Sequence, residues 1–153
     1  MLIAIGCDDA GFKLKEIIKG YLVESGYEVE DYGCYTEDPV DYPDIGYAVA
    51  EGVASGKHDR GILICGTGIG MAITANKVAG IRAAVCHDVY SAERARKSND
   101  AQIMTLGARV IGPELAKKLV SIWLESEFAG GNSKRKVDKI MQVEARYLRR
   151  DVG

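Results

Sequence analysis

A cysteine followed by a glycine-rich turn is the part of this sequence best suited to chemistry. Cys65 follows the apolar run 62–64 and precedes the turn 66–70, which contains three glycines and leads into a helical segment, 71–77. Glycines let a backbone turn sharply and approach a ligand. A helix N-terminus presents free N–H groups that favour an anion and the thiolate form of a nearby cysteine. This combination suits proton transfer next to a carbonyl.

Other interpretations of the same segment stay open from these residues alone. The cysteine and the glycines could serve packing only, because free cysteines are often small buried hydrophobes. A dinucleotide site is disfavoured, since the spacing is not Gly-x-Gly-x-x-Gly and the turn does not follow the first strand. A Walker phosphate loop is also disfavoured, because Met71 stands where that motif has lysine.

The elements that must position these residues alternate along the chain. Short apolar runs predict strands, and amphipathic repeats predict helices. The predicted strands are 1–7, 28–32, 61–65, 81–86 and 101–106, and the predicted helices are about 14–24, 45–54, 71–77, 91–98 and 113–125. Such alternation predicts an α/β fold, with a five-stranded parallel sheet covered by helices on both faces.

Ligands bind outside the carboxyl ends of the strands in such sheets. The polar side chains that follow strands are Asp8 and Asp9 after the first, Cys65 and Thr67 after the third, His87 after the fourth and Arg109 after the fifth. Asn99 precedes the fifth strand, so it is expected at the opposite edge unless a neighbouring subunit supplies it. His58 is expected at that opposite edge as well.

Composition narrows the function. The chain has 153 residues and a net charge of -2, which predicts one domain and a small-molecule partner, with no basic surface for nucleic acid. Its four cysteines are scattered without a Cys-x-x-Cys pair, which favours reduced thiols over disulfides or a metal site. No apolar run approaches the roughly 20 residues of a membrane span. We expect a cytoplasmic protein without membrane attachment.

The segment 130–153 departs from the strand-helix alternation. It is highly charged, and Val137, Ile140 and Met141 fall on one helical stripe. A helix with no strand after it must bury this stripe against its own domain or another subunit. We favour the subunit interface.

Several motifs together resemble a known family, the type B ribose-5-phosphate isomerases and the related galactose-6-phosphate isomerases. These motifs are 6–8 (Gly-Cys-Asp), 40–44 (Val-Asp-Tyr-Pro-Asp), 61–70, 75–77 (Ala-Asn-Lys), 80–84 (Gly-Ile-Arg-Ala-Ala), 98–101 (Ser-Asn-Asp-Ala) and 107–112 (Gly-Ala-Arg-Val-Ile-Gly). The resemblance implies a Rossmann-like three-layer α/β/α sandwich with a C-terminal extension helix. It also implies a cofactor-free and metal-free aldose-ketose isomerase that works through a cis-enediolate, as a homodimer or dimer of dimers with shared sites.

The resemblance also implies roles for individual residues. Cys65 would be the base, assisted by Thr67. The enediolate would be stabilised by the backbone amides of Gly66, Gly68, Ile69 and Gly70. The sugar hydroxyls would bind Asp8 and Asn99, the site would be lined by Tyr42, and the phosphate would contact Arg109.

Four positions depart from the family pattern. Asp9 and Ser98 stand where the family has histidines, and Asn132 and Lys136 replace two phosphate-binding arginines. Because these changes weaken phosphate binding at the usual place, we hypothesise a substrate other than ribose 5-phosphate: an unphosphorylated sugar, or one whose phosphate is placed differently. The alternatives are that lysine and arginine at 134–136 rebuild the anchor for ribose 5-phosphate, or that the chain is a non-catalytic sugar-binding subunit.

Ring opening also needs a replacement, since Ser98 occupies the position of the family's ring-opening acid. His87 has a suitable pKa and follows a strand on the binding edge. A carboxyl at Asp9, spontaneous ring opening, or a surface role for His87 remain as alternatives.

Overall fold

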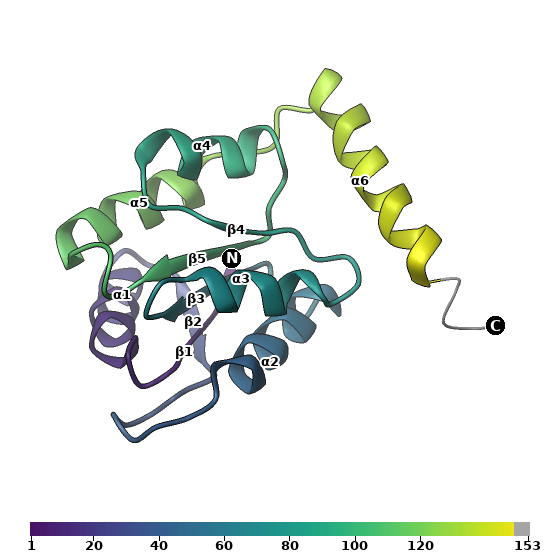
Figure 1. Ribbon diagram of the computed structural model, residues 1–153. Helices are drawn as coiled ribbons and strands as arrows, with labels where there is room; N and C mark the ends of the chain where they lie inside the picture. The colour runs from purple at the N-terminus through teal and green to yellow at the C-terminus, as the bar shows by residue number, and fades with distance from the viewer. Residues whose placement is uncertain (149–153) are drawn as a thin grey trace.

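A computed structural model describes residues 1–148 of the chain (Figure 1). The strands are β1 (Leu2–Cys7), β2 (Glu28–Asp31), β3 (Arg60–Cys65), β4 (Ala83–Val85) and β5 (Ile103–Gly107). The helices are α1 (Phe12–Glu24), α2 (Tyr42–Ala54), α3 (Ile69–Asn76), α4 (Val89–Lys97), α5 (Pro113–Glu125) and α6 (Asn132–Leu148). The strands form one parallel sheet in the order β2-β1-β3-β5-β4. The predicted five-stranded α/β fold is confirmed.

Helices cover the sheet on both faces. α1, α4 and α5 pack on one face, and α2 and α3 pack on the other. Successive side chains of a strand point to opposite faces. On β3, Ile62 and Ile64 therefore join the core that contains Trp123, while Leu63 and Cys65 join the core under α2 and α3. This two-sided burial explains why the strand is apolar throughout.

Several element boundaries differ by one to three residues from those predicted, and the starts of α2 and β4 show why. α2 begins at Tyr42 and not near Ile45, because Pro43 fits the first turn of a helix, where its missing N–H costs nothing. β4 is shorter than predicted. The N–H of Ile81 bonds to the carbonyl of Val78 in a turn, and the N–H of Arg82 bonds to a side chain, so neither joins the sheet ladder.

Strand order brings the chemical residues together. The chain leaves β1 toward β2 on one side, and β3 lies on the other, so the sheet has its topological switch point between β1 and β3. Cys7 pairs with Ile64, which sets Asp8 level with Cys65. Insertion of β5 between β3 and β4 sets Gly107 beside Cys65.

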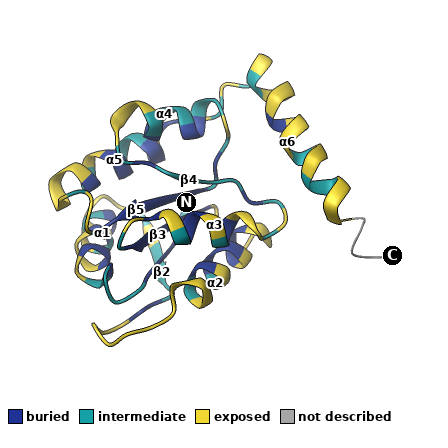
Figure 2. Ribbon diagram, viewed as in Figure 1, coloured by how far each residue is buried: buried dark blue, intermediate teal, exposed yellow. Residues whose placement is uncertain are grey.

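α6 projects from the body on the side opposite the carboxyl end of β5 (Figure 1). It contacts the body through buried Val137, through Met141, whose sulfur accepts a hydrogen bond from Arg82, and through Glu144, whose carboxylate accepts the N–H of Gly80. Most of its remaining surface is exposed (Figure 2). The last five residues of the expected tail, 149–153, lie outside the described residues.

Within residues 1–148, no helix combines the length and the apolar character that a membrane crossing requires.

Candidate active site

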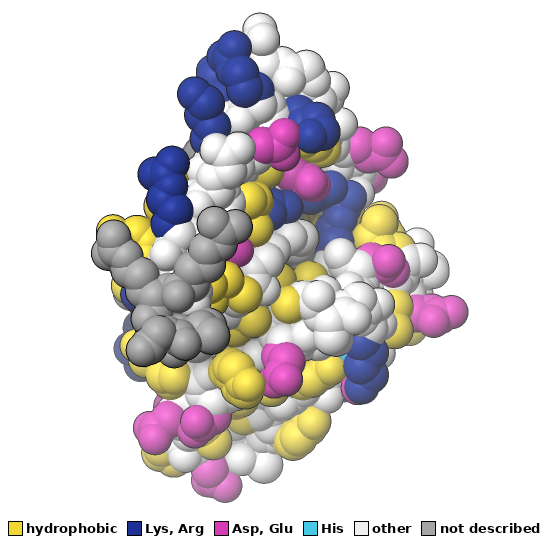
Figure 3. Space-filling model, turned by 90° about the vertical axis from the view of Figure 1, so that its right-hand side faces the viewer, with side chains coloured by type: hydrophobic (Ala, Val, Ile, Leu, Met, Phe, Trp, Pro, Cys, Tyr) yellow, Lys and Arg dark blue, Asp and Glu magenta, His cyan; other side chains and the backbone are white. Residues whose placement is uncertain are grey.

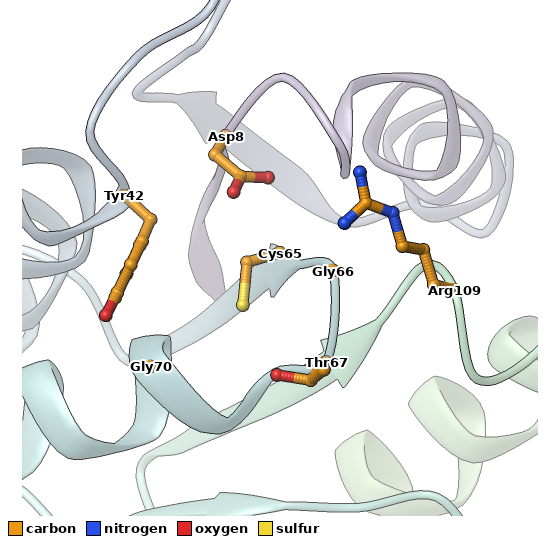
Figure 4. A pocket seen from close by; sticks show the side chains of 7 residues that line it. All are labelled: Asp8, Tyr42, Cys65, Gly66, Thr67, Gly70 and Arg109. Atoms are coloured by element: carbon orange, nitrogen blue, oxygen red, sulfur yellow. The ribbon is translucent and has the colours of Figure 1, made fainter.

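A pocket of about 230 Å³ opens at the carboxyl edge of the sheet, at the switch point between β1 and β3. It is lined by Asp8, Tyr42, Cys65, Gly66, Thr67, Gly70 and Arg109 (Figure 4). Tyr42 and Arg109 stand on opposite sides of Cys65, Asp8 lies above Cys65, and the sulfur points toward the turn that leads into α3 (Figure 4). The fold thus gathers a thiol, a carboxylate, a phenol, a hydroxyl and a guanidinium from four separate segments.

Cys65 ends β3 with its side chain 5% exposed. Its sulfur accepts a hydrogen bond from the backbone N–H of Gly68 at 3.1 Å. Gly68 adopts a left-handed conformation with φ of 79°, and an added Cβ would lie 3.0 Å from the backbone of Leu106. Only glycine combines this conformation with such close packing. The glycine turn therefore aims a backbone donor at the thiol.

Thr67 lies exposed in the same turn, and its Oγ1 accepts the N–H of Ile69 at 3.2 Å. Its hydroxyl hydrogen stays available for a ligand. A Cβ on Gly107 would lie 2.7 Å from the Thr67 carbonyl carbon, so the missing side chain of Gly107 is what lets this turn rest on β5.

Asp8 directly follows β1, and its backbone N–H donates to the carbonyl of Ile64 at 3.2 Å. Its Oδ1 accepts the N–H of Gly11 at 3.0 Å. Burial raises the pKa of Asp8 above the ordinary value, and the hydrogen bond from Gly11 opposes that rise. The carboxylate is therefore oriented by the backbone and can accept a hydrogen bond from a sugar hydroxyl.

Arg109 lies in the turn after β5, where its N–H donates to the carbonyl of Gly66 at 3.0 Å. A Cβ on Gly66 would lie 3.3 Å from Arg109 Nη1, so the guanidinium side chain passes directly over this glycine. Among the residues described, no carboxylate forms an ion pair with Arg109. Its exposed positive charge is available to an anionic group of a ligand.

Gly68 and Ile69 belong to the glycine turn but do not line this pocket, and three further sequence candidates also lie outside the lining. Asp9 accepts the N–H of Val40 through Oδ1 at 3.2 Å, which ties the loop before α2 to the end of β1. His87 accepts the N–H of Gly107 through Nε2 at 2.8 Å. Burial lowers the pKa of His87, although neighbouring Asp88 opposes this. Ser98 Oγ accepts a hydrogen bond from Arg94 Nε at 2.8 Å at the end of α4.

The remaining candidates lie elsewhere on the chain. Asn99 lines a separate cavity of about 260 Å³ beneath α6, together with Arg82 and Ile140. Asn132 and Lys136 are exposed in the first turns of α6. The structure of the single chain thus does not bring these three positions to the Cys65 pocket.

Sequence reasoning missed one element of the site's framework, the buried ion pair of Lys15 and Asp31. Lys15 Nζ is fully buried and donates to both carboxylate oxygens of Asp31, at 2.9 and 3.0 Å, and to the carbonyl of Cys34 at 2.6 Å. Cys34 in turn donates its N–H to the carbonyl of Cys7, directly before Asp8. A lysine adjoining the buried face of an amphipathic helix, next to Leu14, was the signal in the sequence.

No group of three or more His, Cys, Asp or Glu side chains arranged to hold a metal ion is found within residues 1–148.

The chain is similar to a known protein family over most of its length. The family model described as Ribose/Galactose Isomerase matches residues 3–140. A D-erythrulose-4-phosphate isomerase of Pectobacterium atrosepticum is 59% identical, over 93% of this chain and 94% of that protein. A ribose-5-P isomerase B of Listeria innocua is 57% identical, over 94% of this chain and 97% of that protein.

A solved structure of ribose-5-phosphate isomerase B from Clostridium thermocellum superposes with a TM-score of 0.95 at 52% identity, covering 96% of this chain and 99% of that chain. The match extends over the sheet, the helices that cover it and the segments that line the pocket. This chain belongs to the ribose/galactose isomerase family.

Proposed function

We propose that this protein is an aldose-ketose isomerase of sugar phosphates in which Cys65 is the base. The observation that carries the proposal is the pocket itself. It places a thiol that accepts a backbone N–H at 3.1 Å beside Thr67, Asp8 and Arg109, which pairs with no carboxylate of residues 1–148. Family membership supports the same reaction class.

The reaction needs one proton to move between adjacent carbons. The thiolate of Cys65 takes the proton from C2 of the aldose, the C2 electrons form a C1–C2 double bond, and the carbonyl oxygen O1 becomes the enediolate oxygen. Cys65 then returns its proton to C1, and the O2 hydroxyl proton passes to O1 as the C2 carbonyl forms. The electrons and atoms balance without an external oxidant.

Other groups hold the substrate during this exchange. The Gly68 N–H points at the sulfur, so it stabilises the negative charge on the thiolate and not that on the enediolate. The Thr67 hydroxyl is free to donate to the enediolate oxygen. Asp8 accepts a sugar hydroxyl, and Arg109 contacts the phosphate.

The substrate is a 4-phosphorylated tetrose, with D-erythrulose 4-phosphate as its ketose form. The chain contains two histidines, so a second copy could bring to this pocket only its own His58 and His87, engaged in the same way. His58 pairs with Glu30 at 2.6 Å, and the Nε2 of His87 is occupied by Gly107. An imidazole acid for ring opening is thus missing.

A tetrose 4-phosphate needs no such acid. The oxygen that would close a five-membered ring carries the phosphate, so the sugar stays open. Its phosphate also lies one carbon nearer to the carbonyl than in ribose 5-phosphate, which agrees with the altered positions Asn132 and Lys136. The 59% identical Pectobacterium protein is named for this substrate, which supports the assignment. Ribose 5-phosphate is the second candidate, supported by the 57% identical Listeria relative.

A second copy of the chain completes the site in this proposal. Asn99 and α6 lie away from the Cys65 pocket of their own chain. Figure 3 shows apolar side chains on the face that carries α6, and this helix exposes Ile140, Val143 and Leu148 by about half of their surface. Covering these side chains in a homodimer would bury apolar surface and bring the partner's polar residues toward the pocket.

The test is turnover of D-erythrulose 4-phosphate, ribose 5-phosphate and free erythrose in D₂O. We expect the highest kcat/KM for the tetrose phosphate, with solvent deuterium incorporated at C1 or C2. Cys65→Ala should abolish both turnover and deuterium incorporation. Selective turnover of ribose 5-phosphate would overturn the substrate assignment. Full activity of Cys65→Ala would overturn the assignment of the base, and the absence of both turnover and deuterium incorporation with every sugar tested would overturn the isomerase itself.

A further inference from the structure

The imidazole of His87 is bound to the backbone at the end of β5. Its Nε2 accepts the N–H of Gly107 at 2.8 Å. To accept this bond, Nε2 must carry a lone pair, which requires the neutral imidazole with its hydrogen on Nδ1. A protonated Nε2 would repel the same N–H. The bond therefore defines both the charge state and the tautomer of His87.

This bond continues the sheet where the backbone ladder of β4 stops. β4 pairs Val85 with Thr105, and the N–H of Cys86 donates to the carbonyl of Thr105 at 3.1 Å. The next N–H on the β4 side of β5 belongs to Gly107, and the side chain of His87 accepts it in place of a backbone carbonyl. Without His87 this donor would lose its partner within the fold.

Gly107 is the point at which two segments of the pocket meet. Its carbonyl accepts the N–H groups of Val110 and Ile111 at 2.9 and 3.1 Å, which closes the turn that carries Arg109. Its α-carbon rests on the backbone of Thr67, where an added Cβ would lie 2.7 Å from the carbonyl carbon. A displacement of Gly107 therefore moves both Arg109 and the Thr67 turn.

We infer that His87 is a positioning residue for the isomerase site: its neutral Nε2 fixes Gly107, and through Gly107 it aligns Arg109 with the Thr67 turn for binding the anionic end of the substrate. This inference rests on the proposed function. It gives His87 a role in anion affinity, in place of a role as proton donor for ring opening. The lowered pKa of His87, caused by burial, agrees with a neutral side chain.

The test compares two substitutions of His87 with a neighbouring control. His87→Leu removes the acceptor, whereas His87→Gln places an amide oxygen close to the position of Nε2. Tyr90→Ala on α4 is the control, because this side chain is 73% exposed and lies outside the pocket lining.

For His87→Leu we expect KM for the sugar phosphate, and the inhibition constant of inorganic phosphate, to rise roughly 3- to 10-fold, as for the loss of one hydrogen bond. We expect kcat per folded enzyme to stay within about twofold, and His87→Gln and Tyr90→Ala to resemble the parent protein. A purely structural role would lower the folded fraction and leave KM unchanged. Unchanged KM in His87→Leu, or equal defects in the Leu and Gln variants, would overturn the inference.

Hydrogen exchange of the Gly107 amide, followed by NMR together with direct titration of inorganic phosphate, separates this inference from the proposed function. We expect slow exchange in the parent protein and His87→Gln, and fast exchange with weaker phosphate binding in His87→Leu. If the parent protein turned over no sugar, the proposed function would fail. Amide exchange and phosphate affinity would still show whether His87 acts on phosphate binding through Gly107. Unchanged exchange and affinity in His87→Leu, in an active enzyme, would overturn the inference alone.

Discussion

The ring of Tyr42 lies directly against Gly70 at the edge of the pocket. A Cβ added to Gly70 would lie 2.3 Å from the ring Cε1 and 2.7 Å from the phenol oxygen. Gly70 belongs to the first turn of α3, and Tyr42 is the first residue of α2, so the contact joins the starts of two helices on the same face of the sheet. The absent side chain at 70 is what gives Tyr42 its place in the pocket.

Gly70→Ala should therefore displace Tyr42 and reduce kcat/KM roughly 10- to 100-fold, the cost of a misplaced pocket group. Stability should hold or rise slightly, since alanine favours a helix by up to about 1 kcal/mol relative to glycine. Measuring kcat/KM and thermal unfolding on the same variant checks whether activity falls while stability does not. Gly20→Ala on α1, where a Cβ meets nothing within 4 Å, is the matched control. Full activity of Gly70→Ala would contradict the prediction.

Thiol labelling should distinguish Cys65 from the structural cysteines. Burial raises the pKa of Cys86 to about 12, and burial together with neighbouring Cys34 raises that of Cys7 still further. Because the thiolate is the reactive form, these two should resist iodoacetamide in the folded protein. We expect Cys65 to react first and saturating substrate to slow it, as measured by peptide mass spectrometry. Earlier modification of Cys7 or Cys86 would refute the assignment, and urea-unfolded protein supplies the reference rates.

Arg109→Leu should weaken binding of phosphorylated sugars, because no described carboxylate competes for this guanidinium. A charged hydrogen bond to phosphate contributes about 1.5–3 kcal/mol, which corresponds to a rise in KM of roughly 10- to 150-fold. KM for an unphosphorylated aldose should change little. Lys118→Gln, which removes an exposed charge on α5, is the charge control. Equal effects on phosphorylated and free sugars would show that Arg109 does not contact the phosphate.

The Lys15–Asp31 pair should shape the pH dependence of stability. Burial alone would raise the pKa of Asp31, but the hydrogen bonds from Lys15, Gly33 and Lys19 hold it below its usual value. A depressed folded pKa contributes stability that is present above the unfolded pKa of about 3.9 and is lost as pH falls through the folded value. Lys15 has a raised pKa despite its burial, so its contribution persists up to the unfolded value of about 10.4 and is lost above it.

Urea unfolding from pH 2 to 7 tests this expectation. The acid loss should shrink in Asp31→Asn, and Lys15→Met should cost roughly 3 kcal/mol at pH 7, because it leaves a largely buried carboxylate with fewer partners. Glu114→Gln is the control, since Glu114 is exposed and its pair with Lys117 lies on the surface. If the free energy of unfolding fell equally at low pH in the parent protein and in Asp31→Asn, the acid loss would come from other groups.

The sequence predicted the parts of this molecule that depend on local pattern. The apolar run before Cys65 and the glycines after it specify a buried strand and a tight turn, and both are found. Strand order depends on contacts between distant segments. β5 pairs with β3 although about 40 residues separate them, and the packing of the Thr67 turn on Gly107 has no signature in the local sequence either.

The same limit applied to individual side chains. The sequence could place His87 at the binding edge of the sheet, but not show that its Nε2 would accept a backbone N–H. Likewise, Asp9 was a candidate for substrate contact, yet its carboxylate bonds to Val40, 31 residues further along the chain. Residue type and strand position predict a neighbourhood, whereas hydrogen-bond partners depend on the tertiary contacts.

Ser98 offers a gain-of-function test of the open-chain substrate. If a ring-opening acid is missing, the rate of ribose 5-phosphate conversion should stop rising at high enzyme concentration, because spontaneous ring opening then limits it. The rate with a tetrose 4-phosphate should stay proportional to enzyme concentration. Ser98→His should raise the ribose 5-phosphate plateau by roughly 10- to 100-fold, within reach of general acid catalysis, and leave the tetrose rate unchanged. Ser98→Asn, which adds a polar side chain without an acid, is the matched control. A ribose 5-phosphate rate that grew linearly with the parent enzyme would show that the site already opens rings, and the open-chain assignment would then fail.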